Sequence, residues 1–167
     1  MSIDIHPFFP SDLSPLQKLF IALNKSQSTL DSYLEEHQQE KRELLVAYKN
    51  NILAGYLTIT WHSLYPFFNN NSIPEIMDFN VLPEFRKQGI GSNLLAAAEQ
   101  LVQEKGFDTV GIGVGLYADY GPAQKLYVKK GYIPDGNGVT YRYKYSTPGS
   151  SVCLDDDLIL WFTKKLL

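Results

Sequence analysis

The sequence has little of what marks secreted or membrane proteins. It holds one cysteine, Cys153, in 167 residues, which excludes an internal disulfide framework and suits a reducing compartment. No apolar run approaches the roughly 20 residues that a membrane span needs. No basic segment followed by an apolar one stands at the N-terminus, as it would in a signal peptide. These absences predict a cytoplasmic protein that does not contact a membrane.

An excess of positive charge is also missing. The chain carries 15 basic and 18 acidic residues, giving a net charge of −3, so no overall positive field favours nucleic acid as a partner. No two histidines or cysteines stand at the spacing of a metal site, so we expect no metal. The apolar fraction of 44% is ordinary for a globular protein. The length predicts one domain, residues 1–167, with a core of its own.

What the chain does contain is a strand, a basic loop and a long helix in direct succession. Residues 76–82 are mostly apolar and end at Pro83, which cannot donate a hydrogen bond to a neighbouring strand. Beyond the loop, apolar side chains recur at helical spacing, and Gly106 follows as a predicted C-cap. The helical positions are Ile90, Leu94, Leu95, Ala98, Leu101 and Val102.

The loop itself has the chemistry of an anion site. Gly89 and Gly91 let the backbone come close to a ligand, and the first N–H groups of the following helix have no partner within it. Arg86 and Lys87 add full positive charges beside those donors. The loop is therefore predicted to bind a pyrophosphate, although the glycines alone would also fit a tight turn ahead of a buried helix.

Strands and helices alternate along the rest of the chain, which predicts an α/β protein with a mixed sheet. Lys49-Asn50-Asn51 is predicted to be a hairpin turn because asparagine tolerates positive φ. Residues 62–74 form an aromatic loop that either covers core aromatics or walls a substrate pocket. Strands are predicted at residues 3–9, 44–48, 52–61, 109–116, 139–145 and 158–163, and a further strand begins at Tyr132. Helices are predicted to begin at Ser14 or Ser11, to run from about residue 30 to 41, and to span residues 121–131.

Two motifs carry a family resemblance. Arg86-Lys87-Gln88-Gly89-Ile90-Gly91 resembles the acetyl-CoA loop of the GNAT superfamily of N-acetyltransferases, written Arg/Gln-x-x-Gly-x-Gly/Ala. It lacks the Gly-Lys-Ser/Thr of nucleotide hydrolases and the third glycine of dinucleotide-binding loops. Leu126-Tyr127 followed by Lys130-Gly131-Tyr132 resembles the family's Leu-Tyr-x-x-x-Gly-Phe/Tyr. The order of the elements matches the GNAT fold as far as about residue 135.

The resemblance implies a fold and a cofactor site. The expected fold is a mixed, mostly antiparallel sheet with helices on both faces, in which strands 75–82 and 109–115 splay apart. The pantetheine arm of acetyl-CoA would lie between them and bond the backbone of Phe79, Asn80 and Val81. The pyrophosphate would bind mainly to backbone N–H groups of one continuous segment: Arg86, Lys87, Gln88, Gly89, Ile90, Gly91 and Ser92.

The resemblance also implies the reaction. An acetyl group would pass from acetyl-CoA to a primary amine, of a small molecule or a protein, by direct attack in a ternary complex. Tyr127 would protonate the departing thiolate, since a phenol with a pKa near 10 holds its proton at pH 7. The alternative for Tyr127 is a core residue packed on Leu126. Tyr120 stands where the family often has an asparagine that contacts the cofactor.

A protonated amine needs a base before it can attack a thioester. By the resemblance, Glu75 is the expected base, with Asp78 as the alternative base or as an anchor for the amine. Strand alternation would place the two on opposite faces unless a bulge intervenes. The Val81 N–H would stabilise the oxyanion. A catalytically silent module that binds acyl-CoA is the alternative function, and the protein would be a monomer or a homodimer.

Overall fold

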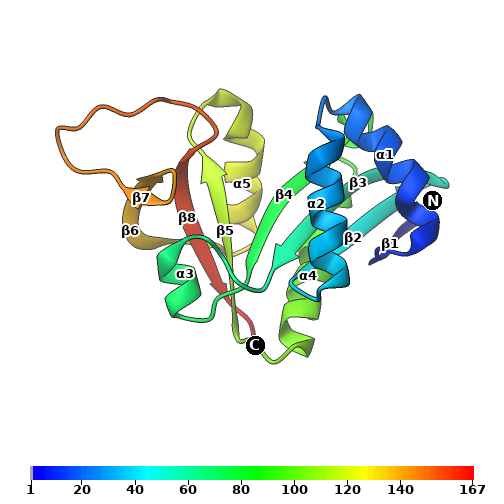
Figure 1. The fold of residues 1–167 in the computed structure, drawn as a ribbon, viewed down its shortest axis with the longest axis horizontal. Coiled ribbons are helices and arrows are strands. Elements are labelled where there is room, and N and C mark those ends of the chain that lie inside the picture. Colours follow the sequence, from blue (N-terminus) through cyan, green and yellow to red (C-terminus); the bar gives the residue numbers. More distant parts are fainter. Residues whose placement is uncertain (1) are drawn as a thin grey trace. The chain divides into compact units, whose positions relative to one another are not determined.

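The computed structural model describes residues 2–167, which form two compact units. The first unit contains residues 2–61 and Ile76–Leu101, and the second contains His62–Glu75 and Val102–Leu167. Figure 1 shows the helices and strands of both. The prediction of one domain stays a prediction.

The first unit is built on four strands in the order β1-β2-β3-β4. They are β1 (Ile3–Pro7), β2 (Arg42–Lys49), β3 (Ile52–Thr60) and β4 (Glu75–Val81), of which the first residue, Glu75, belongs to the second unit. The pairs β1/β2 and β2/β3 are antiparallel. The predicted hairpin turn is confirmed, with Asn50 and Asn51 at φ +52° and +62°. β1 ends at Pro7, as expected for a residue that cannot extend a ladder.

Two helices of the first unit, α1 (Leu13–Ala22) and α2 (Gln27–Gln38), lie beside β3 and β2 (Figure 1). A short 3₁₀ turn, Pro10–Asp12, precedes α1, so the helix begins at neither Ser11 nor Ser14. The Ser26 side chain caps α2 by accepting a hydrogen bond from Thr29 N. Apolar side chains of both helices pack on those of the strands, and this cluster contains Leu16, Leu19, Phe20, Leu30, Leu44, Val46, Leu53 and Tyr56.

Helix α4 (Ile90–Glu104) follows the glycine-containing loop as predicted. It ends at Gly106, whose φ of +91° and backbone bond to the Gln103 carbonyl confirm the predicted C-cap. The apolar positions at helical spacing are buried at Ile90, Leu94, Leu95, Ala98 and Val102. The sequence pattern thus fixes the face of α4 that packs inward.

The second unit has its strands in the order β5-β8-β6-β7, all antiparallel. They are β5 (Thr109–Gly115), β6 (Ile133–Tyr141), β7 (Lys144–Tyr145) and β8 (Leu158–Lys165), accompanied by α3 (Pro66–Asn70), α5 (Gly121–Lys129) and a 3₁₀ turn, Ala118–Tyr120. The aromatic loop contains the unpredicted helix α3. Tyr65 and Phe68 are fully buried against Trp161, so both serve as core residues.

The predicted α/β class with mainly antiparallel strands is confirmed. The splay between residues 75–82 and 109–115 stays a prediction. Within residues 2–167, no helix has the length and apolar character to cross a membrane.

Candidate functional site

The loop before α4 is an open turn with a left-handed backbone at two positions. Leu82 leads into a 3₁₀ turn over Pro83–Phe85, and the chain then takes positive φ at Lys87 (+57°) and Gly89 (+88°). Lys87, Gln88 and Gly89 are exposed. A Cβ built on Gly89 would meet nothing closer than 3.8 Å, so the glycine is needed for its backbone conformation and not for packing. The first N–H groups of α4 have no partner within the helix.

Side chains of the loop fasten the turn to itself. The Arg86 Nε donates to the Val81 carbonyl at 3.0 Å, and the Gln88 amide donates to the Glu84 carbonyl at 2.9 Å. Lys49 in turn donates to the Gln88 amide oxygen. The side chains of Arg86 and Gln88 thus hold the turn in place. The predicted pyrophosphate segment contains this exposed turn, and its binding of a pyrophosphate stays a prediction.

Strand β4 departs from regular geometry at Asp78, whose φ is +51°. Aspartate is among the few non-glycine residues that tolerate this conformation. The predicted alternation of side chains along residues 75–78 assumes an extended chain, and that assumption fails at Asp78. β3 comes close to β4 just beyond this point. A Cβ on Gly55 would stand 2.6 Å from the Asn80 carbonyl oxygen, so only glycine fits there.

The Asp78 carboxylate is surrounded by donors from the first unit. Oδ1 lies 2.6 Å from Lys25 Nζ and accepts from the Asn80 amide at 2.7 Å, while Oδ2 accepts from the Tyr56 hydroxyl at 2.7 Å. Burial, and then the charge of Asp78, raise the pKa of Tyr56 and of Tyr33 well above the ordinary value, so both phenols stay protonated. The Asp78 carboxylate is thus paired with the ammonium group of Lys25 beside the hydroxyl of Tyr56.

Neither Lys25 nor the two tyrosines could be recognised as site residues from the sequence. Lys25 follows the end of α1, more than 50 positions before Asp78. The α1 terminus is a Schellman motif in which Asn24 has φ +55°, Asn24 N donates to the Ile21 carbonyl, and Lys25 N donates to the Phe20 carbonyl. The sequence offered one signal for the end of α1, Asn24, because asparagine is common where helices end in a left-handed turn.

Glu75, the predicted base, is 5% exposed. Its Oε2 accepts a hydrogen bond from the Ser63 hydroxyl at 2.5 Å, and that hydroxyl also accepts from Tyr65 N at 3.0 Å. Ser63 is therefore oriented by the backbone of its own loop and directed at the carboxylate. Sequence reasoning did not identify Ser63.

Tyr127, the predicted acid, lies on α5 and is 5% exposed. Burial raises its pKa above the ordinary value of 10, so the hydroxyl holds its proton at neutral pH. Its ring centroid lies 6.1 Å from that of Tyr132, whose N–H donates to the Tyr127 carbonyl. The helix ends at Gly131 with φ +90°, which accounts for the glycine of the motif.

Tyr120, at the position where an asparagine was expected, has partners of its own. The Tyr120 ring lies against Gly115, where an added Cβ would be 2.3 Å from a ring carbon. Its hydroxyl donates to Asp156 at 2.8 Å, and Tyr117 donates to the same oxygen. The two phenols therefore tie the segment before β8 to the start of α5.

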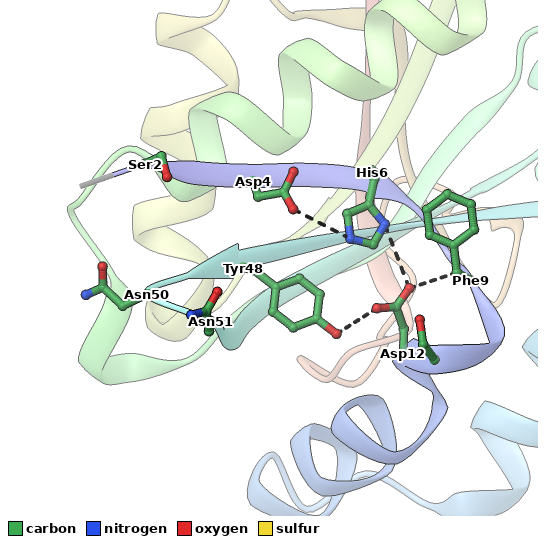
Figure 2. A pocket seen from close by; sticks show the side chains of 9 residues that line it. Ser2, Asp4, His6, Phe9, Asp12, Tyr48, Asn50 and Asn51 are labelled. Atoms are coloured by element: carbon green, nitrogen blue, oxygen red, sulfur yellow. Dashed lines mark hydrogen bonds and ion pairs between the residues drawn. The ribbon is translucent and has the colours of Figure 1, made fainter.

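A separate cavity of about 530 Å³ opens beside β1. Figure 2 shows His6 between the rings of Phe9 and Tyr48, with Asp12 accepting hydrogen bonds from Phe9 N and from the Tyr48 hydroxyl. No residue predicted to bind acetyl-CoA or to act in catalysis lines this cavity.

Comparison with known proteins agrees with the two motifs. The sequence pattern of the Acetyltransferase (GNAT) family matches residues 12–132. A protein of Bacillus subtilis (strain 168), provisionally described as a [ribosomal protein bS18]-alanine N-acetyltransferase, is 31% identical over 136 residues, covering 81% of this chain and 78% of that protein.

Solved structures share the fold. A GNAT family acetyltransferase from Elizabethkingia anophelis with acetyl-CoA bound superimposes with a TM-score of 0.64 at 23% identity, over 98% of each chain. A ribosomal-protein-alanine N-acetyltransferase from Brucella melitensis gives a TM-score of 0.70 at 19% identity, over 98% of this chain and 99% of its own. The match over residues 12–132 and the similarity to the Bacillus subtilis protein together show that the chain belongs to the GNAT acetyltransferase family.

Proposed function

We propose that the protein transfers an acetyl group from acetyl-CoA to a primary amine by direct attack in a ternary complex. The observation that carries the proposal is the exposed turn before α4, with positive φ at Lys87 and Gly89, in a chain of the GNAT acetyltransferase family. An acetyl-CoA-bound structure of a protein with this fold supports the choice of cosubstrate.

The turn would hold the pyrophosphate. Backbone N–H groups of Gln88 to Ser92 supply donors, the α4 dipole favours negative charge, and Lys87 adds a full positive charge. The backbone of Phe79, Asn80 and Val81 would bond the pantetheine arm. The Val81 N–H would then stabilise the negative oxygen that develops on the acetyl group.

Proton transfer requires a base and an acid. Glu75 would take a proton from the ammonium form of the acceptor, directly or through a water. The amine nitrogen then attacks the acetyl carbon, the carbon–sulfur bond breaks, and Tyr127 gives its proton to the CoA thiolate. The second proton that the nitrogen loses as it becomes an amide returns to the Tyr127 oxygen, directly or through water. The raised pKa of Tyr127 supports this role, because the hydroxyl remains protonated at neutral pH.

The acceptor class is a primary amine of a small molecule or a protein. The Bacillus subtilis relative is provisionally described as an alanine N-acetyltransferase of ribosomal protein bS18, so a peptide with a free N-terminal alanine is the first acceptor to test. Binding of acetyl-CoA without turnover on any amine of a panel would favour a silent acyl-CoA-binding module instead.

The test compares two glycines at opposite ends of α4. Gly89→Leu should abolish acetyl-CoA binding in calorimetry, because the side chain fills the space above the turn. Gly106→Leu has a similar backbone penalty, since Gly89 and Gly106 have φ +88° and +91°, and open space around it. It should therefore bind acetyl-CoA normally. Circular dichroism checks the fold of both, and unchanged affinity in a folded Gly89→Leu variant would refute the proposal.

A further inference from the structure

Lys25 contacts Asp78 through a primary amine. This is the group that an amine acetyltransferase must bind in its acceptor. Lys25 carries a primary ammonium, and its Nζ lies 2.6 Å from Oδ1 of the carboxylate. By the family resemblance, the same carboxylate is either an alternative base or an anchor for the acceptor amine. The chain therefore supplies its own primary amine to a group that would hold a substrate.

The surroundings of Asp78 are those of an ammonium-binding site. Tyr56, fully buried, and Asn80 donate to the carboxylate through hydrogen bonds in which Lys25 takes no part. Phe20 stacks on Tyr56 with ring centroids 5.1 Å apart, and Lys25 Nζ lies 6.0 Å from the Phe20 ring. Aromatic faces attract cations, so this wall favours any ammonium that reaches the carboxylate.

The arrangement lets Lys25 leave without unfolding its loop. Its backbone is fixed, because Lys25 N donates to Phe20 O at the end of α1 and Ser26 caps the start of α2. Only the four-carbon stem has to move, and that side chain is 27% exposed against 12% for Asp78. A soluble amine can thus reach the carboxylate by displacing one flexible side chain.

We propose that Asp78, with Tyr56, Tyr33 and Asn80, is a binding site for a primary ammonium group, that Lys25 occupies this site in the absence of substrate, and that Lys25 thereby sets the affinity for the acceptor. The inference rests on the proposed amine acetyltransferase function. It predicts that the acceptor enters as a cation and competes with Lys25, so that acceptor affinity falls in proportion to the fraction of time that Lys25 is in place.

The test uses L-alaninamide, a small primary ammonium, as the probe. In protein with ¹⁵N-labelled lysine, the ammonium NMR signal of Lys25 is assigned by its loss in Lys25→Met. Adding L-alaninamide should move this signal saturably toward those of solvent-exposed lysines. N-acetyl-L-alaninamide, which has no ammonium, and sodium chloride at equal concentration should leave it unmoved.

Calorimetry gives a second, independent measurement. Lys25→Met keeps an unbranched side chain but removes the charge, and it should bind L-alaninamide about tenfold more tightly than the wild type if Lys25 occupies the site about nine-tenths of the time. Lys18→Met, which removes an exposed lysine of α1, should bind as the wild type does. Asp78→Asn should not bind the probe.

Two results would overturn the inference: a Lys25 signal that L-alaninamide does not move, or a folded Lys25→Met variant that binds the probe no more tightly than the wild type. Acetyl-CoA calorimetry on the same samples separates this outcome from failure of the proposed function. Normal acetyl-CoA binding with an unresponsive Lys25 rejects the ammonium site alone. A responsive Lys25 without acetyl-CoA binding rejects the transferase.

Discussion

Glu75 and Asp78 are three residues apart in β4, yet their carboxylates have different partners. Glu75 is met by the neutral hydroxyl of Ser63, whereas Asp78 is met by the ammonium of Lys25 and by two further donors. A general base needs a lone pair that can receive a proton, and a carboxylate that binds an ammonium is better suited to holding a cation. The ammonium partner of Asp78 supports Asp78 as the anchor, and the role of Glu75 as the base stays a prediction.

The largest expected effect tests which of the two carboxylates, Glu75 or Asp78, is the base. Glu75→Gln keeps the shape of the side chain but removes its basicity, so it should lower kcat by about 10²- to 10⁴-fold and flatten the pH–rate profile on the limb that reports the base. Asp78→Asn should act mainly on KM for the amine. Steady-state kinetics over a pH series measures both. A flattened profile in Asp78→Asn together with an unaltered one in Glu75→Gln would reverse the two assignments.

The next prediction concerns Tyr127, the proposed acid, whose role differs from that of the base. Tyr127→Phe should lower kcat by about 10²-fold and leave acetyl-CoA affinity unchanged, because only the proton for the thiolate is lost. Burial raises the pKa of Tyr127 above 10, so the wild-type hydroxyl remains an acid up to that pH. Kinetics and calorimetry on one preparation give the two numbers. Equal kcat values would return Tyr127 to the role of a core residue beside Tyr132.

The smallest expected effects concern stability and the donors of the two carboxylates. Tyr56→Phe removes a hydrogen bond to a charged group and should lower the free energy of unfolding by about 1.5–3 kcal/mol at pH 8. The folded pKa of Tyr56 is raised above its unfolded value near 10. The stability linked to its proton is therefore complete below pH 10 and lost as the pH rises further.

Denaturant unfolding at pH 8 and pH 11 tests this sign. The difference in stability between the wild type and Tyr56→Phe should shrink at pH 11, because the wild type alone loses the stability tied to the Tyr56 proton. Ser63→Ala removes the donor to Glu75 without removing a phenol, so its cost should be the same at both pH values. A constant difference for Tyr56→Phe would show that its ionisation does not govern alkaline stability.

Local signals in the sequence were enough for much of the fold. Asn50-Asn51 gave the hairpin, Gly106 and Gly131 gave two helix ends, and the loop before α4 follows from its glycines. Each of these depends on the conformational preference of one or two residues. The start of α1 and the short helix α3 were harder, because a 3₁₀ turn and a five-residue helix leave almost no periodic pattern.

The candidate site was less predictable because its contacts are long-range. The positive φ of Asp78 is compatible with aspartate, but its partners Lys25 and Tyr56 come from distant parts of the chain. Ser63 is twelve residues from Glu75 and lies in a loop with no motif. β6 runs through Gly136 and Gly138, with a register irregularity between Pro134 and Val139 that the glycine-rich sequence concealed. The family motifs identify the segments that carry the candidate site residues. The side chains that contact those residues are known only from the folded structure.

Gly55 carries no functional group, yet the absence of a side chain there lets β3 approach Asn80, whose amide donates to the Asp78 carboxylate. Any side chain there would press on the carbonyl of Asn80, two residues beyond the left-handed turn of β4. Even a methyl group would have to push that segment aside, and the carboxylate would turn away from its ammonium. If Asp78 is the proposed ammonium site, Gly55→Ala should therefore weaken acceptor binding although residue 55 touches no substrate.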